Sequence, residues 1–186
     1  MSCVARRVTA LAALAAAGTF AAAGASASTP PTSPLPFDPL TGSIGGMRLH
    51  DPMSKLIKLL GPPDRIIPLP GGPPISFWLT GKALCTAWAQ AYPENAHSGL
   101  VSFWYRGPVV TKRGDRLRTP ASVVRKHWRG SWQYLAHVSG GQGPNYGHIG
   151  HFGSATFGFD GRKRLAGVSI QTSEQIWQPI IMPPCP

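Results

Sequence analysis

The chain has 186 residues, enough for one domain or two small ones, and 18 lysine and arginine residues against 7 aspartate and glutamate residues give it a net charge of +11. No two of the few acidic residues are spaced as a glycosidase acid and base would be, and neither a Gly-x-Ser-x-Gly elbow nor a phosphate-cradling loop is present. The charge favours anionic partners such as envelope polymers, anionic lipid headgroups or acidic proteins, although solubility alone could also account for it. No DNA- or RNA-binding motif occurs, so we expect no nucleic acid partner.

The first residues have the pattern of an export signal. Two arginines precede an apolar, alanine-rich run, and Ala25, Ser26 and Ala27 supply the small residues that precede a cleavage site. We predict a signal peptide over residues 1–27 and a secreted or extracytoplasmic mature chain with 16 basic and 7 acidic residues. An uncleaved membrane anchor is the alternative, which so short and alanine-rich a run disfavours. The proline-rich stretch 28–43 then predicts an extended tether without packed structure.

A fifteen-residue phrase occurs twice in the chain. It reads GMRLHDPMSKLIKLL over residues 46–60 and GDRLRTPASVVRKHW over residues 114–128, with Gly, Arg, Leu, Pro, Ser and Lys in register. In each copy a capping residue, Asp51 or Thr119, stands before a proline, which predicts a helix start, and apolar residues follow at helical spacing. Glycine after each copy, joined by two prolines after the first, predicts where each helix ends.

Each expected helix is followed by three segments that alternate in polarity and are bounded by turn residues, as strands are. These segments are residues 75–79, 84–92 and 99–107 after the first copy, and residues 131–138, 151–159 and 164–172 after the second. We therefore predict an α+β fold of two tandem repeats, each a helix followed by an antiparallel β-meander, over residues 44–107 and 108–174, with a tail over residues 175–186. Two such units side by side bury more apolar surface than one alone.

These residues carry a family resemblance. The Gly-x-x-Leu helix start, the GPPD stop at residues 61–64 and the following meander resemble secreted actinobacterial proteins of the β-lactamase-inhibitor-protein type. The half-unit is also similar to the small lipoprotein of the outer-membrane β-barrel assembly machine. The resemblance covers residues 42–172, although the second copy lacks the GPPD stop. It implies tandem repeats whose sheets form a concave protein-binding surface, and it implies no particular target.

Two cysteines remain in the mature chain, Cys85 and Cys185. An even number of cysteines in an exported protein predicts a disulfide, which would tie the C-terminal tail across the first sheet. Two unpaired, buried thiols are the alternative.

The alternation of the first three strands predicts a binding surface. Trp78, Trp88 and Trp104 each fall on the more polar side of a strand, opposite small, aliphatic or aromatic residues. Together with Tyr92 and Arg106 they would form an exposed aromatic strip, and Trp, Tyr and Arg dominate the hot spots of protein interfaces. The alternative is that the rings cover the second face of the sheet against the other repeat or the proline-rich tail.

The basic residues concentrate in the second half of the chain. They are Lys112, Arg113, Arg116, Arg118, Arg125, Lys126, Arg129, Arg162, Lys163 and Arg164. Loop and helix charges of this kind are usually a solvated face, and we interpret them in that way.

The candidate metal ligands are His148 and His151, a His-x-x-His pair in a glycine-rich stretch. A zinc site needs at least a third protein ligand, and the spacing of His127, His137 or Asp160 does not supply one. We therefore expect no metal, no cofactor and no catalytic residue. The sequence is interpreted as a secreted, non-enzymatic binding protein whose aromatic sheet face binds a protein or an envelope component. A metal-dependent envelope hydrolase using the two histidines, or a structural envelope protein held by charge, is the alternative.

Overall fold

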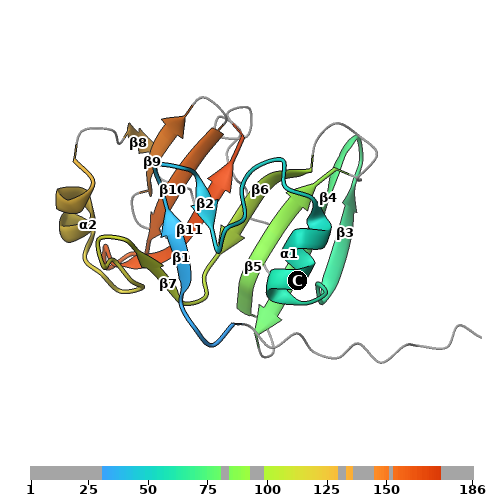
Figure 1. The fold of residues 1–186 in the computed structure, drawn as a ribbon, viewed down its shortest axis with the longest axis horizontal. Coiled ribbons are helices and arrows are strands. Elements are labelled where there is room, and N and C mark those ends of the chain that lie inside the picture. The colour runs from blue at the N-terminus through green and yellow to red at the C-terminus, as the bar shows by residue number, and fades with distance from the viewer. Residues whose placement is uncertain are drawn as a thin grey trace, which may run out of the picture.

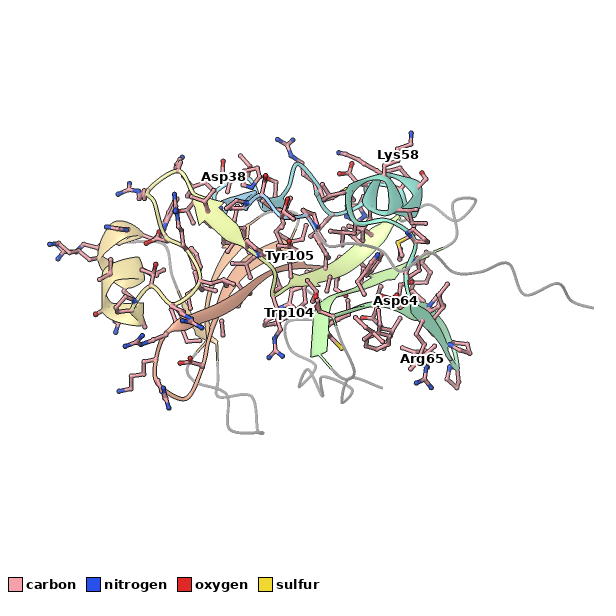
Figure 2. All side chains as sticks on the ribbon, turned by 90° about the horizontal axis from the view of Figure 1, so that it is seen from below. Asp38, Lys58, Asp64, Arg65, Trp104 and Tyr105 are labelled. Carbon is pink, nitrogen blue, oxygen red and sulfur yellow. The ribbon has the colours of Figure 1, made fainter. Side chains whose placement is uncertain are left out.

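A computed structural model of the chain describes residues 31–80, 84–92, 99–129, 133–135, 145–150 and 153–172. This part of the chain is mostly β (Figure 1). A large antiparallel sheet carries α1 and a small sheet on one of its sides, and α2 lies at one end of the molecule (Figures 1 and 2).

The elements are short and follow one another closely. In chain order they are β1 (Leu35–Asp38), β2 (Ser43–Ile44), α1 (Met53–Leu60), β3 (Arg65–Leu69), β4 (Gly72–Thr80), β5 (Leu84–Ala91), β6 (Leu100–Tyr105), β7 (Val109–Thr111), α2 (Ala121–His127), β8 (Gln133–Leu135), β9 (Asn145–Gly150), β10 (Gly153–Phe159) and β11 (Leu165–Gln171). The strands predicted over residues 75–79, 84–92 and 99–107 are confirmed as β4, β5 and β6.

The large sheet has eight strands in the order β3-β4-β5-β6-β11-β10-β9-β8. Its two halves join where β6 pairs antiparallel with β11, with Trp104 opposite Ser169 and Phe103 opposite Ile170. The small sheet has the order β2-β1-β7, and β1 runs parallel to β7.

The predicted α+β fold of two tandem helix-plus-meander repeats is wrong. The helices contain only 8 and 7 residues, and the strands that follow them belong mostly to one eight-stranded sheet, with a second, three-stranded sheet formed by β2, β1 and β7. Pairing β6 with β11 removes two exposed strand edges, which is favourable because unpaired edge groups otherwise face solvent. Alternation along a strand reveals its faces but not its neighbours, so this pairing was not visible in the sequence.

The stretch predicted to be an unpacked tether contains β1 and the beginning of β2. Leu35 and Phe37 are buried, and the ring of Phe37 meets the ring of Phe157 edge-on at 5.0 Å. Pro36 lies between them in the same strand, because proline is compatible with extended backbone. Proline content therefore misled the prediction, and the alternation of buried and exposed residues was the better signal.

The two copies of the repeated phrase form the same turn before their helices. In the first, the backbone N–H of Arg48 donates to Asp51 Oδ2 at 2.7 Å; in the second, the N–H of Arg116 donates to Thr119 Oγ1 at 3.0 Å. The residue before each acceptor has a positive φ, 67° at His50 and 71° at the equivalent arginine. These side chains therefore close turns; they are not helix N-caps.

The helices begin one residue later than predicted. Pro52 and Pro120 occupy the N-cap positions, and neither helix has a side-chain cap. α1 ends at Leu60, and Gly61 is its C-cap, as predicted. The carbonyl oxygen of Gly61 accepts a 2.9 Å hydrogen bond from Trp78 Nε1.

The two faces of the large sheet differ in their packing. We call the side that packs against α1 and the small sheet the helix face, and the opposite side the far face. The helix face carries the main core, which includes Phe103, Tyr105 and Phe157 together with Leu56 of α1. Figure 2 shows Tyr105 and Trp104 pointing to opposite sides of the sheet.

Candidate functional site

The predicted exposed aromatic strip does not exist in this form. Trp78, Trp88 and Trp104 are 3%, 8% and 4% exposed. Trp88 and Trp104 lie opposite each other on β5 and β6, and their rings stack at 6.3 Å on the far face. Trp78 belongs to the core of the helix face, because its neighbour Phe77, not Trp78 itself, lies opposite Trp88. The predicted alternation is observed in β4 and β6, but in β5 Cys85 lies on the same face as Trp88, because the pairing shifts between Trp78 and Leu79. The register between strands also decides which faces coincide.

The other predicted binding residues lie at separate places. Tyr92 is exposed just after β5, whereas Arg106 is exposed just after β6. Arg106 and Trp104 line a cavity of about 110 Å³ together with the β10–β11 turn, at Asp160 and Gly161. The structure thus brings Trp88, Trp104 and Arg106 to one region of the sheet and separates Trp78 from them.

The predicted disulfide and metal ligands fall partly outside the described residues. Cys85 belongs to a disulfide in the structure, but Cys185 is not among the described residues, so their pairing stays a prediction. His148 lies in β9, where only the backbone is described, and His151 is outside the described part. Within the described residues, no three His, Cys, Asp or Glu side chains are grouped as metal ligands would be.

The strongest candidate site is the end of the molecule around α2, which we call the basic end. It consists of residues 111–129 and the turn 160–164 between β10 and β11. Ten lysine and arginine side chains, all exposed, stand here against two aspartates; they are Lys112, Arg113, Arg116, Arg118, Arg125, Lys126, Arg129, Arg162, Lys163 and Arg164. Residues 31–107 hold six basic and four acidic residues, so the charge is strongly asymmetric. Figure 2 shows nitrogen-tipped side chains projecting around this end.

Asp115 organises the basic end from the inside. It is 1% exposed, and its Oδ2 accepts hydrogen bonds from Thr111 Oγ1 at 2.9 Å and Trp128 Nε1 at 2.7 Å. Its Oδ1 lies 2.7 Å from Nδ1 of His127, the last residue of α2. A buried carboxylate with several hydrogen-bond partners is well satisfied, and here it ties the hairpin after β7 to the end of α2.

Trp128 supports two of the cations. The Nζ of Lys112 lies 5.9 Å from its ring, and the guanidinium carbon of Arg113 lies 5.1 Å from it. Cation–π contacts within 6 Å are attractive, so the indole holds these side chains at the surface. Asp115 fixes the indole in turn through its N–H group.

Backbone hydrogen bonds hold the turn 160–164 alongside residues 118–121. The N–H of Arg118 donates to the carbonyl of Leu165 at 2.8 Å, and the N–H of Ala121 donates to the carbonyl of Lys163 at 2.9 Å. Asp160 closes the turn, since its Oδ1 accepts the N–H groups of Arg162 and Arg164, both at 2.9 Å. Both acidic groups of the basic end therefore serve structural hydrogen bonds, while the cations face solvent.

The sequence indicated the residues of the basic end but not how they are arranged in space. The ten cations were visible as a concentration of charge and were interpreted only as a solvated face. Their assembly depends on the contact between residues 116–121 and the turn 160–164. These two segments are far apart in the sequence, so a pattern of neighbouring residues cannot reveal that they meet.

Comparison with known proteins gives little guidance. No family model and no curated protein matches this chain. It is similar to a solved extracellular protein containing an SCP domain from Bacillus anthracis str. Ames, with 16% identity and a TM-score of 0.47, over 69% of this chain and 45% of that one. This chain thus spans less than half the length of that protein, and a likeness at this level carries no argument about function.

Neither α1 nor α2, the two helices in the described part of the chain, has the length and apolar composition that a membrane crossing requires.

Proposed function

We propose that this protein is an exported, non-enzymatic binding protein that holds an anionic polymer of the cell envelope against its basic end. The observation that carries the proposal is the exposure of ten cationic side chains around two aspartates that both accept internal hydrogen bonds. Such a concentration of one sign of charge attracts polyanions and raises their association rate. The export signal predicted over residues 1–27 would bring the protein to such polymers.

A hydrophilic polymer fits the basic end better than a lipid surface does. Helices that insert at a bilayer interface pair their basic side with a broad apolar side. Among the large apolar side chains that are exposed in the described residues, only Val123 lies at the basic end. The cations also come from a hairpin, a helix and a turn, which suits a flexible chain that can follow several segments.

The aromatic face that the sequence predicted as a binding surface is not part of this proposal, because its tryptophans are buried. The alternative of a hydrolase using His148 and His151 gains no support from the described residues.

The test uses linear inorganic polyphosphate as the probe and charge reversal as the perturbation. We expect the triple variant Lys126→Glu, Arg129→Glu, Arg162→Glu to lose affinity by about tenfold or more in calorimetric titrations at low salt, because attraction between unlike charges is lost and repulsion replaces it. The affinity of the unchanged protein should fall steeply as salt rises, since each contact releases counterions from the polymer.

The matched control reverses the charge of three exposed residues that lie outside the basic end, through Arg48→Glu, Lys58→Glu and Arg65→Glu. It changes the net charge by the same amount. We expect it to keep most of the affinity. Equal losses in the two triple variants would mean that net charge alone matters and would contradict a defined site. Binding to vesicles that contain anionic lipid, without binding to polyphosphate, would overturn the proposed polymer and indicate a membrane surface as the partner.

A further inference from the structure

The far face of the large sheet is buried, although no described element packs on it. Its cluster consists of Ile75, Phe77, Cys85, Trp88 and Trp104, supported by Ile67 and Leu79. All of these residues belong to β3, β4, β5 and β6, whereas α1, α2 and the small sheet contribute to the core of the helix face. A sheet face that is open to solvent would leave two stacked indoles largely exposed, yet only 8% and 4% of them is accessible.

The chemistry of the far face indicates an apolar cover. The Nε1 atoms of Trp88 and Trp104 are buried without a hydrogen-bond partner, as are the hydroxyl oxygens of Thr156 and Ser169. The register places Ser169 opposite Trp104 and Thr156 opposite Ser169, so the four groups share this face. Buried polar atoms are usually paired, and four neighbouring exceptions mean that the cover excludes water without supplying polar groups to them.

Cys85 identifies the end of the covering segment. It lies in the far-face cluster and belongs to a disulfide. The chain contains only two other cysteines, Cys3 within the predicted signal peptide and Cys185 at the C-terminus. Removal of the signal peptide would leave Cys185 alone as the partner.

The length of the remaining chain fits this path. β11 ends beside the start of β6, where the N–H of Thr172 donates to the carbonyl of Val101. The path from there to Cys85 crosses two strand spacings and about five residues of β5, roughly 20 Å in all. Cys185 comes thirteen positions after Thr172, and an extended chain over thirteen positions reaches roughly 43 Å.

We propose that the far face is a binding platform for an apolar, proline-rich peptide segment, and that the chain's own C-terminal residues 173–186 occupy it, anchored by a Cys85–Cys185 disulfide. The segment reads SEQIWQPIIMPPCP, so its second half is apolar and rich in proline. Grooves lined by aromatic rings bind proline-rich segments because such segments are already extended and lose little entropy on binding. The stacked indoles of Trp88 and Trp104 supply such rings.

The first measurement is a disulfide map of the secreted, unreduced protein by peptide mass spectrometry. We expect a peptide that contains Cys85 linked to one that contains Cys185. Cys85 as a free thiol, or linked to Cys3, would overturn the proposal.

The second measurement is hydroxyl-radical footprinting, which reports the exposure of individual tryptophans. A variant that ends at Thr172 and carries Cys85→Ser should show oxidation of Trp88 and Trp104 raised several-fold over the full chain. Trp78 is the internal control, because it lies in the core of the helix face and should stay protected. Protection of all three tryptophans in the shortened chain would overturn the proposal.

Increased oxidation of all three tryptophans would mean that the shortened chain unfolds. The proposal would then be tested in the intact protein with its disulfide formed. A photoreactive residue at Gln90, which lies opposite Ser102 on the far face, should crosslink to residues 173–186. The same residue at the exposed Ser54 of α1 is the control and should not. Crosslinks from Gln90 to any other segment, or none, would overturn the proposal.

Discussion

The turns that precede α1 and α2 have the same backbone geometry and different surroundings. In the first turn, the N–H of His50 donates to the carbonyl of Leu100 and the N–H of Leu100 to that of Asp51, both at 2.8 Å. In the second turn, Arg118 and Thr119 exchange the equivalent pair of bonds with Leu165, at 2.8 and 2.9 Å. The repeated phrase therefore serves to dock a turn on a strand in each half of the sheet.

The difference between the two regions lies in their acidic residues. Asp51 pairs with Lys55 Nζ at 2.7 Å on the surface, where the two side chains are 23% and 47% exposed. The second region has a threonine at the equivalent position, and its carboxylate, Asp115, is buried beneath Trp128 and His127. The same backbone geometry is thus accompanied by a surface ion pair in the first region and by an excess of exposed cations in the second.

The largest effect is expected from the two aspartates. Asp115→Ala should lower the free energy of unfolding by about 3–5 kcal/mol, because it leaves the buried groups of Thr111 and Trp128 without their acceptor. Asp51→Ala should cost about 1 kcal/mol or less, since exposed ion pairs contribute little. Urea denaturation measures both, and similar losses would show that burial does not distinguish the two carboxylates.

Alkaline stability should depend on Tyr105, which lies in β6 near the junction of the sheet halves. Burial raises the pKa of Tyr105 to about 12 from its ordinary value of 10. Below pH 10 the phenol is neutral in both states and its contribution to stability is complete; as the pH rises from 10 to 12, the unfolded chain ionises first and stability is lost. The loss should reach about 2–3 kcal/mol.

The control for this pH dependence is Tyr105→Phe, which should remove this part of the alkaline loss. It should also stabilise the protein by about 1 kcal/mol at neutral pH, because the phenol oxygen is buried without a partner. An unchanged slope between pH 10 and 12 in the variant would assign the loss to other groups.

Close packing of the first turn should make one glycine sensitive. A Cβ at Gly99 would lie 2.3 Å from the carbonyl oxygen of Asp51, so Gly99→Ala should cost about 2 kcal/mol or more. Gly114 has φ +83° and open space around it, so Gly114→Ala should cost only about 1 kcal/mol of backbone strain. Thermal melts of the two variants give the comparison, and a larger loss at Gly114 would contradict it.

The smallest effect is expected at the hydroxyl that closes the second turn. Thr119→Ala should lower the free energy of unfolding by about 0.5–1.5 kcal/mol, because the N–H of Arg116 loses its acceptor. Thr119→Ser keeps the oxygen and should retain most of this stability. If denaturation curves give Thr119→Ser the same loss of unfolding free energy as Thr119→Ala, the methyl group of the threonine stabilises the turn and the hydrogen bond does not.

Much of the local structure was predictable from neighbouring residues. The glycine after α1, the strands β4 to β6 and the two faces of β4 and β6 follow from turn residues and from alternation, which act over a few positions. The concentration of cations in the second half was likewise visible without a structure.

The fold class and the sites depended on contacts between distant residues. Proline concealed β1, whose burial comes from Phe157 more than a hundred positions away. The strand register placed Trp78 on one face and Trp88 on the other, and only that register shows that the three indoles cannot form one surface.

Local chemistry along the chain was therefore sufficient for the positions of turns, several strands and the excess of positive charge, because each of these depends on residues that are close in sequence. The tertiary structure alone decided that β6 joins β11, that the turn 160–164 lies beside α2, and that Asp115 is buried while the cations around it are exposed. Strand pairing and burial depend on which distant surfaces exclude water from one another, and the alternation of side chains within a strand is compatible with many such pairings.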